Sequence, residues 1–285
     1  MTRLHVAAAL LIVAACAKPQ RPGETHWGPE PKVPVQRVAT LAPSLTDLVI
    51  ALGAGDRIVG VTRFDEAPQV AKVPRIGGYS DPEPEAVIRV APDIVLCQPS
   101  PGNKGAAEAI AKAGIPVLAM PLETLSDIDD ATTRIAALLG LQEAGKREVQ
   151  RLREARQTAR TAAQKRPRPI KVAILFSLDP IVAAGPGTFL HEMLEDVGAV
   201  DVVQRSAQPY PKLSPENLVM AKPDAILLAL MPGGGAPLEH PVAGVAAPGI
   251  PLKSGGFMRP GPLVPEALAE LTALLDRLAA PVLPK

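Results

Sequence analysis

Aromatic residues are scarce in this chain of 285 residues, which holds four phenylalanines, two tyrosines and one tryptophan. The hydrophobic content of 47% therefore comes mainly from Ala, Val, Leu and Ile, and it suffices for two ordinary cores. Because the aromatic side chains are so few, the position of each one is informative. The length fits one large domain or two modest ones.

An excess of charge is also missing. The formal net charge is +1, and no cluster of basic residues is interleaved with aromatics. A nucleic-acid-binding surface needs such a cluster, so the sequence excludes that class of partner.

The chain has only two cysteines, Cys16 and Cys97. If Cys16 carries lipid, Cys97 has no partner in the chain, and the fold does not depend on a disulfide. Cys97 ends the apolar run 93–97, where we expect a small buried thiol that packs like alanine rather than a nucleophile or metal ligand.

Recognisable catalytic and metal-binding motifs are absent as well. There is no Gly-x-Ser-x-Gly, no His-Glu-x-x-His and no Gly-Lys-Ser/Thr phosphate loop. Four histidines occur, and His191 and His240 are the only two outside the N-terminal segments, so a three-histidine site cannot form. Gly185-x-Gly187 lacks the third glycine of a dinucleotide loop. We therefore predict no catalytic residue, no resident metal and no cofactor.

The N-terminus resembles a lipoprotein signal. Residues 6–15 are almost wholly apolar, too few for the roughly 20 that span a bilayer, and small residues precede Cys16. We predict a signal peptide at 1–15, lipid on Cys16, and attachment to a membrane in the periplasm or at the cell surface. The alternative is an ordinary signal whose cysteine is incidental. Residues 16–36 are polar and proline-rich, which favours an extended tether.

A repeat divides the rest of the chain into halves. The segment Tyr79-x4-Pro-Glu85-x-Val-Ile-x3-Pro-Asp-x-Val-Leu recurs 131 residues later as Tyr210-x4-Pro-Glu216-x-Leu-Val-x3-Pro-Asp-x-Ile-Leu. Both tyrosines of the chain fall in this register. A repeat of this period indicates two similar lobes.

Short apolar runs alternate with helical patterns in both halves, which is typical of parallel sheets covered by helices. The predicted fold class is α/β, with two Rossmann-like lobes, a first at 37–140 and a second at 168–285. Strands are expected at 37–41, 57–61, 93–97, 116–120, 170–176 and 224–230, and helices after Pro84 and at 104–114, 188–198 and 263–280. Ser44 and Asp47 fit a capping box at the start of another helix.

Residues 142–166 contain no proline and are rich in Arg, Glu, Ala and Gln. They predict one long helix, within a connecting segment at 141–167, that would span roughly 37 Å and brace both lobes. Such a connector is stiff, so we expect only small hinge motion between the lobes.

Several motifs together resemble those of the substrate-binding proteins of ABC importers for cobalamin, haem and iron siderophores, whose lobes are joined by a long helix. The likeness covers about residues 36–280 and is strongest to the cobalamin-binding branch. It rests on Leu41-Ala-Pro-Ser-Leu-Thr-Asp, Ala51-Leu-Gly-Ala-Gly-Asp, Val59-Gly-Val-Thr, Gly77-Gly-Tyr, the repeated Pro-Glu segments, Gly185-Pro-Gly-Thr-Phe-Leu and Arg259-Pro-Gly-Pro.

The resemblance implies a monomer that delivers its ligand to an ABC permease dimer with ATPase subunits. A glutamate on each lobe of such proteins docks against permease arginines, and the matching positions are Glu85 and Glu216. The alternative is that each glutamate only follows a helix-opening proline, where negative charge stabilises the helix start by about 0.3 to 1 kcal/mol.

The same resemblance implies a corrinoid ligand, related to cobalamin, held between the lobes at the C-terminal ends of the strands. The positions implied for ligand contact are Phe64, Tyr79, Phe176, Tyr210, Phe257 and Arg259. Some of these aromatics, Phe176 first, could instead belong to the core. Gln98 stands where cobalamin-binding relatives often have tryptophan.

Three alternatives remain open. Within the class, the ligand could be haem or a ferric siderophore, and Tyr79 or Tyr210 could then serve as an iron ligand. Outside it, an enzyme on a doubly wound fold would need a catalytic pair that we do not find, and a surface scaffold without transport function would need no bound ligand.

Overall fold

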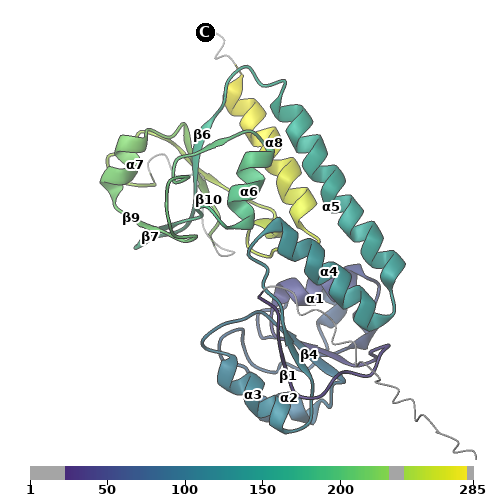
Figure 1. The fold of residues 1–285 in the computed structure, drawn as a ribbon. Coiled ribbons are helices and arrows are strands. Elements are labelled where there is room, and N and C mark those ends of the chain that lie inside the picture. Colours follow the sequence, from purple (N-terminus) through teal and green to yellow (C-terminus); the bar gives the residue numbers. More distant parts are fainter. Residues whose placement is uncertain (1–22, 231–240, 281–285) are drawn as a thin grey trace, which may run out of the picture.

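The computed structural model describes residues 23–230 and 241–280, which form two α/β lobes connected by one long helix (Figure 1). The first lobe contains β1 (Thr25–Trp27), β2 (Val38–Thr40), α1 (Pro43–Ala51), β3 (Ile58–Gly60), α2 (Pro84–Arg89), β4 (Ile94–Cys97), α3 (Lys104–Lys112), β5 (Val117–Ala119) and α4 (Leu125–Leu139). The second contains β6 (Lys171–Leu178), β7 (Ile181–Ala183), α6 (Phe189–Asp196), β8 (Val200–Asp201), β9 (Lys212–Leu213), α7 (Pro215–Ala221), β10 (Ala225–Leu228), β11 (Gly249–Pro251) and α8 (Val264–Ala279). Short 3₁₀ helices lie at Gly55–Arg57, Pro68–Val70 and Gly255–Phe257.

The central strands form because their residues are apolar on both sides. All four residues of β4 and all four of β10 are buried, as expected for parallel strands covered by helices on both faces. In the first lobe the strand order is β1-β5-β4-β2-β3, and in the second it is β11-β10-β6-β7-β9, with β8 also paired to β6. The predicted two-lobed α/β fold is confirmed.

The sheets are mixed rather than wholly parallel, which corrects one part of the prediction. Strand β1 pairs antiparallel with β5, and β7 pairs antiparallel with both β6 and β9. The antiparallel members are edge or near-edge strands of two or three residues, whose short sequences carry no alternating pattern.

Part of the expected tether belongs to the first lobe. Strand β1 extends the first sheet by pairing Trp27 with Val117, and Val35 is fully buried. The first lobe therefore begins before residue 37. Proline-rich composition predicted an extended chain here, and an extended chain at a sheet edge can pair as a strand.

Helix α1 starts differently from the expected capping box. Pro43 occupies the first turn, the N-cap is Ala42, and no side chain caps the helix. Ser44 is already inside the helix and 95% buried, and Asp47 points toward the second lobe. Pro at the first helical position replaces one of the backbone N–H groups that a cap would otherwise satisfy. Gly53, with φ of 84°, follows the helix as expected.

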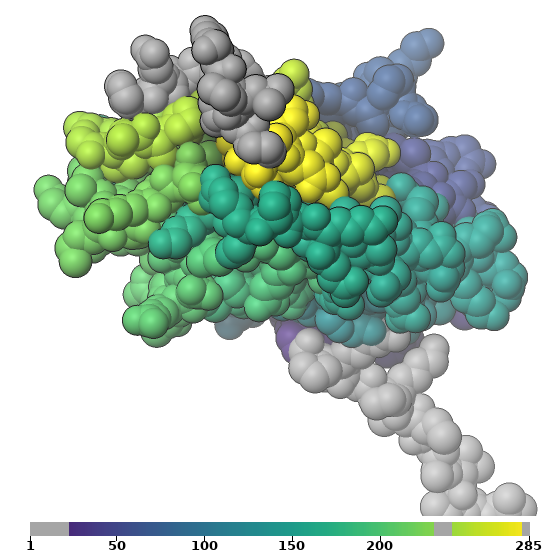
Figure 2. All heavy atoms as spheres, turned by 90° about the horizontal axis from the view of Figure 1, so that it is seen from above, coloured from purple at the N-terminus to yellow at the C-terminus, as the bar shows by residue number. Residues whose placement is uncertain are grey.

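The long connecting helix is confirmed as α5, which runs from Gln142 to Ala163. It packs against α4 of the first lobe and against α6 and α8 of the second. Figure 2 shows α5 in teal lying along α8 in yellow, with the second lobe in green beside them. On the second lobe, Arg156 and Arg160 each donate to the 3%-exposed carboxylate of Asp196, at 2.6 and 2.7 Å. On the first lobe, Arg153 lies 3.2 Å from Asp129.

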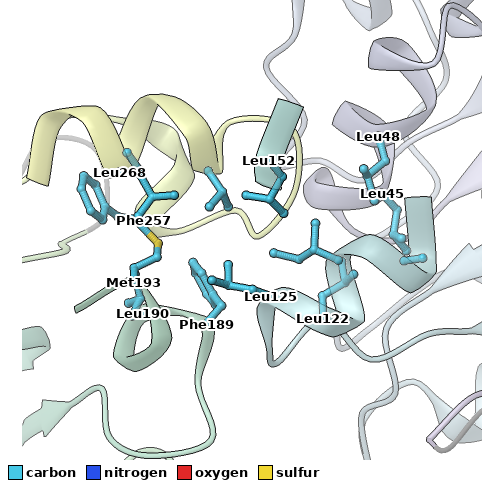
Figure 3. Packing of buried hydrophobic residues seen from close by; sticks show 14 of the residues in the cluster. Leu45, Leu48, Leu122, Leu125, Leu152, Phe189, Leu190, Met193, Phe257 and Leu268 are labelled. Atoms are coloured by element: carbon cyan, nitrogen blue, oxygen red, sulfur yellow. The ribbon is translucent and has the colours of Figure 1, made fainter. Parts of the chain in front are cut away.

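One hydrophobic cluster crosses from lobe to lobe. Figure 3 shows Leu45 and Leu48 of α1 at one end, Leu122, Leu125 and Leu152 in the middle, and Phe189, Met193, Phe257 and Leu268 at the other. These side chains are at most 5% exposed. The lobes therefore share a core beside α5 instead of being joined by the helix alone. Among residues 23–230 and 241–280, no helix has the length and apolar character needed to cross a membrane.

Candidate functional site between the lobes

The loop after β3 presents Phe64 to solvent, because a neighbouring carboxylate fixes the backbone. Asp65 is 4% exposed and accepts hydrogen bonds from the backbone N–H and hydroxyl of Thr62, at 2.8 and 2.6 Å. Phe64 is left 50% exposed, and the guanidinium of Arg63 lies 5.1 Å from its ring centroid. Arg63 also pairs with Asp81, two residues beyond Tyr79. An exposed aromatic ring held on a fixed loop is available to a ligand.

Tyr210 reaches from the second lobe to the first. Its hydroxyl donates to Oε2 of Glu123 at 2.7 Å, and its ring meets Phe176 edge-on, with centroids 5.7 Å apart. Phe176 lies near the end of β6, and Glu123 follows β5. We refer to Tyr79, Glu123, Phe176 and Tyr210 as the tyrosine site.

Tyr79 occupies the corresponding position on the first lobe. Its backbone oxygen accepts a hydrogen bond from the side-chain amide of Asn103 at 3.3 Å, and that amide also donates to Gln98 O at 2.8 Å. The Tyr79 ring is half-buried and packs against the shared core. Asn103 thus ties together the two loops that follow β3 and β4.

The carboxylate of Glu123 lies near both phenols of the tyrosine site. Partial burial raises the pKa of Tyr210 above its ordinary value, and the hydrogen bond and negative charge of Glu123 raise it further. Burial also raises the pKa of Tyr79, with a smaller contribution from the charge of Glu123. Both phenols therefore stay protonated at neutral pH and act as hydrogen-bond donors.

Glu123 was not predicted from the sequence. Its position, just beyond the buried strand β5, is the signal that could have identified it, because side chains that follow parallel strands meet at one edge of a sheet. Two further contacts fix this segment against the second lobe: Glu123 O accepts from Phe189 N at 2.5 Å, and Leu125 N donates to Glu192 Oε2 at 2.7 Å.

Arg259 of the second lobe faces Asp47 of α1, with Nε 3.4 Å from Oδ2. Burial raises the pKa of Asp47 to about 6, while the positive charge of Arg259 acts in the opposite direction and Asp65 adds a smaller increase. Arg259 is 31% exposed. It already has a carboxylate partner, so a ligand would share this guanidinium with Asp47.

Phe257 does not fit the role implied for it. Its side chain is 1% exposed and packs in the shared core near Met193 and Leu268 (Figure 3). The short 3₁₀ helix at Gly255–Phe257 turns the ring inward. Phe257 is a core residue in this structure, whereas the doubted Phe176 is only partly buried and contacts Tyr210.

Glu85 and Glu216 lie in the first turns of α2 and α7, on different lobes and away from α5 (Figure 1). Both side chains are exposed. A hydrogen bond from Ser214 holds the pKa of Glu216 below its usual value. Neither glutamate belongs to the tyrosine site.

Two further residues considered in the sequence analysis, Cys97 and His191, are buried or partly buried inside the lobes. Cys97 is 1% exposed, as predicted, and burial raises its pKa to about 12. His191 has Nδ1 2.7 Å from Asp201 Oδ2, inside the second lobe. Within the described ranges, no three His, Cys, Asp or Glu side chains gather as metal ligands would. Cys16 and His240 lie outside the described residues.

A hollow of about 610 Å³ lies far from the tyrosine site, at the C-terminal ends of α5 and α8. Its lining includes Thr161, Lys165, Arg166 and Asp276. Arg166 is 2% exposed and already pairs with Asp276 at 2.8 Å, so this guanidinium is satisfied within the protein.

Known proteins resemble this chain in sequence and in fold. A sequence profile of the periplasmic binding protein family matches residues 38–240. A vitamin B12-binding protein of Pectobacterium atrosepticum is 25% identical over 262 residues, covering 85% of this chain and 89% of that protein.

Two solved structures share the fold. The periplasmic vitamin B12-binding protein BtuF of Vibrio cholerae superposes with a TM-score of 0.70 at 23% identity, covering 86% of this chain and 98% of its own. The periplasmic heme-binding protein RhuT from Roseiflexus, in apo form, gives 0.73 at 24% identity, covering 86% and 99%. Since the profile spans most of the sequence, the chain belongs to the periplasmic binding protein family and is a substrate-binding protein of the ABC-importer type rather than an enzyme.

Proposed function

We propose that this protein captures a corrinoid, cobalamin or a close relative, between its two lobes and delivers it to an ABC permease driven by ATPase subunits. The observation that carries the proposal is the tyrosine site, where aromatic rings from both lobes meet around Glu123. Aromatic faces with polar edges suit a large, mainly apolar ligand that carries amide groups on its rim. The vitamin B12-binding relatives support the same ligand.

The charges near the site favour a neutral ligand over an acidic one. Glu123 accepts its hydrogen bond from the phenol of Tyr210, which does not neutralise its charge. The guanidiniums of Arg63 and Arg259 already pair with Asp81 and Asp47. Amide groups of a corrinoid can donate to Glu123 and accept from the phenols. Haem carries two carboxylates, and these would be repelled by Glu123.

Haem or a ferric siderophore is the second candidate, because two phenols stand close together and tyrosine can ligate ferric iron. The heme-binding protein RhuT has the same fold, which is compatible with this candidate. Iron ligation by either tyrosine would require loss of the phenol proton, which burial and Glu123 oppose.

Docking to the permease is proposed to use Glu85 and Glu216. Each is exposed at the start of a helix on its own lobe, and a carboxylate pairs selectively with arginine. Reversing both charges should abolish uptake and leave ligand affinity unchanged. Uptake that persists in the E85K/E216K variant would remove the docking role.

The proposed location is the periplasm or the cell surface, with the mature chain held at a membrane by lipid on Cys16. The small residues before Cys16 and the family of the chain support this location. Mass spectrometry of the protein from membranes would detect acyl groups on that cysteine, and a soluble, unacylated product would exclude the anchor.

Titration of the chain from residue 17 with cyanocobalamin in a calorimeter tests the ligand. Saturable one-to-one binding with a Kd near or below about 1 μM would support the corrinoid, a value that corresponds to about 8 kcal/mol of binding free energy. The Y79A/Y210A variant should bind more weakly while remaining folded. Absence of heat at several temperatures, with binding to haemin or a ferric siderophore, would transfer the function to the second candidate.

A further inference from the structure

The repeated segments of the two lobes form the same structural element. Helix α2 begins at Pro84 and α7 begins at Pro215, and each has its proline at the first helical positions. The offset between the helices is the 131 residues of the sequence repeat, so each residue of α2 has a structural counterpart on α7. The two helices can therefore be compared position by position.

Both helices bury one aliphatic residue and expose the next. Val87 and its counterpart Leu218 are 0% and 1% exposed, and they attach the helices to their lobes. Ile88 and its counterpart Val219 are each 41% exposed. Neither helix needs this second aliphatic side chain for its own attachment.

The exposed aliphatic residue lies beside the exposed glutamate. Ile88 follows Glu85 by three positions, and Val219 follows Glu216 by three. Residues three apart on a helix are neighbours on one face, about 5 to 6 Å apart at Cβ. Each lobe thus displays a carboxylate and a branched aliphatic side chain side by side. We call these two matching surfaces the lobe patches: Glu85 with Ile88, and Glu216 with Val219.

Exposed apolar side chains are otherwise few. Among the described residues, seven large hydrophobic side chains are exposed: Val33, Phe64, Ile88, Tyr210, Val219, Met220 and Met258. Phe64 and Tyr210 belong to the region proposed for the ligand, and three of the other five lie on α2 or α7. A single exposed aliphatic residue is common on protein surfaces. An exposed aliphatic residue at the same repeat position on both lobes calls for an explanation.

We propose that Ile88 and Val219 are contact residues for the permease, each inserting into an apolar recess beside the arginine that receives the neighbouring glutamate. This inference rests on the proposed transport function. A partner made of two like halves would offer the same recess twice, which accounts for the same side-chain pair on two lobes. A second copy of this chain would set each glutamate against another glutamate, and like charges repel, so the occupant is the permease dimer rather than a second copy.

The aliphatic residue adds something that the glutamate alone cannot supply. An exposed carboxylate–arginine pair contributes little by itself, because water surrounds both charges and added salt weakens their attraction further. Burying an apolar side chain next to the pair excludes water from it and gives an attraction that salt does not screen. The lobe patches therefore combine a charge that selects the partner with a contact that retains it.

The two patches are not identical. Arg89 follows Ile88, whereas its counterpart Met220 is 80% exposed. Met220 extends the apolar surface of the second lobe, while Arg89 adds a positive charge on the first. We expect the second lobe to contribute more of the salt-resistant part of docking.

The test measures docking of the mature chain to the cognate permease–ATPase complex in lipid nanodiscs, by surface plasmon resonance, with and without cyanocobalamin. The variants are I88S, V219S and I88S/V219S. V33S is the matched control, because Val33 is 58% exposed and lies on neither helix. Calorimetric titration with cyanocobalamin and urea unfolding check that each variant keeps its ligand affinity and stability.

We expect I88S/V219S to raise the Kd for the permease complex about tenfold or more, with a share from each single variant, while V33S stays within about twofold of wild type. The residual binding of I88S/V219S should fall more steeply with salt between about 0.1 and 1 M. A Kd for I88S/V219S that matches V33S, or a loss confined to one lobe, would overturn the inference.

The charge variant E85K/E216K separates this inference from the proposed function. If E85K/E216K loses docking and I88S/V219S does not, transport by this protein stands and the aliphatic contact is refuted. If the wild-type chain does not dock at all, the transport function and the inference both fail.

Discussion

Tyr210 and Glu123 join the lobes through a hydrogen bond of 2.7 Å. This contact raises the pKa of Tyr210, which a titration can measure. Replacing Glu123 with glutamine removes a negative charge that opposes ionisation, so the pKa of Tyr210 should fall toward its ordinary value of about 10. Because Tyr79 is the only other tyrosine, phenolate absorbance during an alkaline titration reports on these two residues alone. The Y79F variant isolates Tyr210, and superimposed curves for E123Q and wild type would contradict the electrostatic role.

Asp47 should make stability depend on pH. Its pKa is raised from 3.8 to about 6 in the folded protein, so the native state binds this proton more tightly than the unfolded chain does. The contribution is fully present below pH 4 and is lost as pH rises through about 6. The loss amounts to about 3 kcal/mol at most, from roughly 1.4 kcal/mol for each pKa unit.

The D47N variant tests this dependence. Urea unfolding of wild type and D47N from pH 4 to 7 should give curves whose difference changes in favour of D47N as pH rises, because asparagine does not titrate. All other groups titrate alike in both proteins and cancel in the difference. A difference that is constant over this range would show that Asp47 ionises normally.

Individual site residues were predictable to different degrees. Tyr79 and Tyr210 followed from the repeat, and the structure places both near Glu123. Asp47 satisfied the local spacing of a capping box, yet the helix begins at a proline and leaves Asp47 free to face Arg259. Phe257 ends a short 3₁₀ helix that has no periodic sequence signal, and its ring packs into the shared core. Contacts between segments far apart in sequence decided the last two cases.

Helix α5 is held to the second lobe by two arginines that share one carboxylate. Asp196 is 3% exposed, whereas Arg156 and Arg160 are 26% and 50% exposed. The D196N variant removes the negative charge that pairs with both guanidiniums. We expect the free energy of unfolding to fall by about 1 to 3 kcal/mol. Urea unfolding at neutral pH measures it.

Asp129 provides the matched control for the same helix. It pairs with a single arginine, Arg153, which is 64% exposed. Such a solvent-screened pair contributes about 0 to 1 kcal/mol, so D129N should cost less than D196N. Equal losses in the two variants would show that the shared carboxylate has no special part in fixing α5.

Elements with a strong period or a long apolar run were predictable, and short ones were not. The 22 residues of α5 and the fully buried β4 and β10 appear close to their expected bounds. Strands β1, β7 and β9 have two or three residues each, and they exist because a neighbouring strand offers free backbone groups. No local sequence pattern encodes that neighbour.

At the scale of the whole molecule, one large hydrophobic cluster extends through both lobes, beside a smaller cluster within each lobe. Leu125 is fully buried between Leu152 of α5 and Phe189 of the second lobe (Figure 3). Elements that share a core lose it together, which favours one cooperative transition over separate unfolding of two lobes. The same continuity supports the expectation of small hinge motion, which stays a prediction.

Trp27 allows the cooperativity to be measured. It is the single tryptophan, and it lies on β1 against the smaller hydrophobic cluster of the first lobe, which includes Val117 and Ala119, so its fluorescence reports on that lobe alone. Circular dichroism reports on the helices of both lobes. In urea the two signals should change at the same midpoint, and L125A should lower both together by about 2 to 5 kcal/mol of stability. A Trp27 transition that separates from the dichroism, in wild type or in L125A, would show that the lobes unfold independently and that the shared core does not couple them.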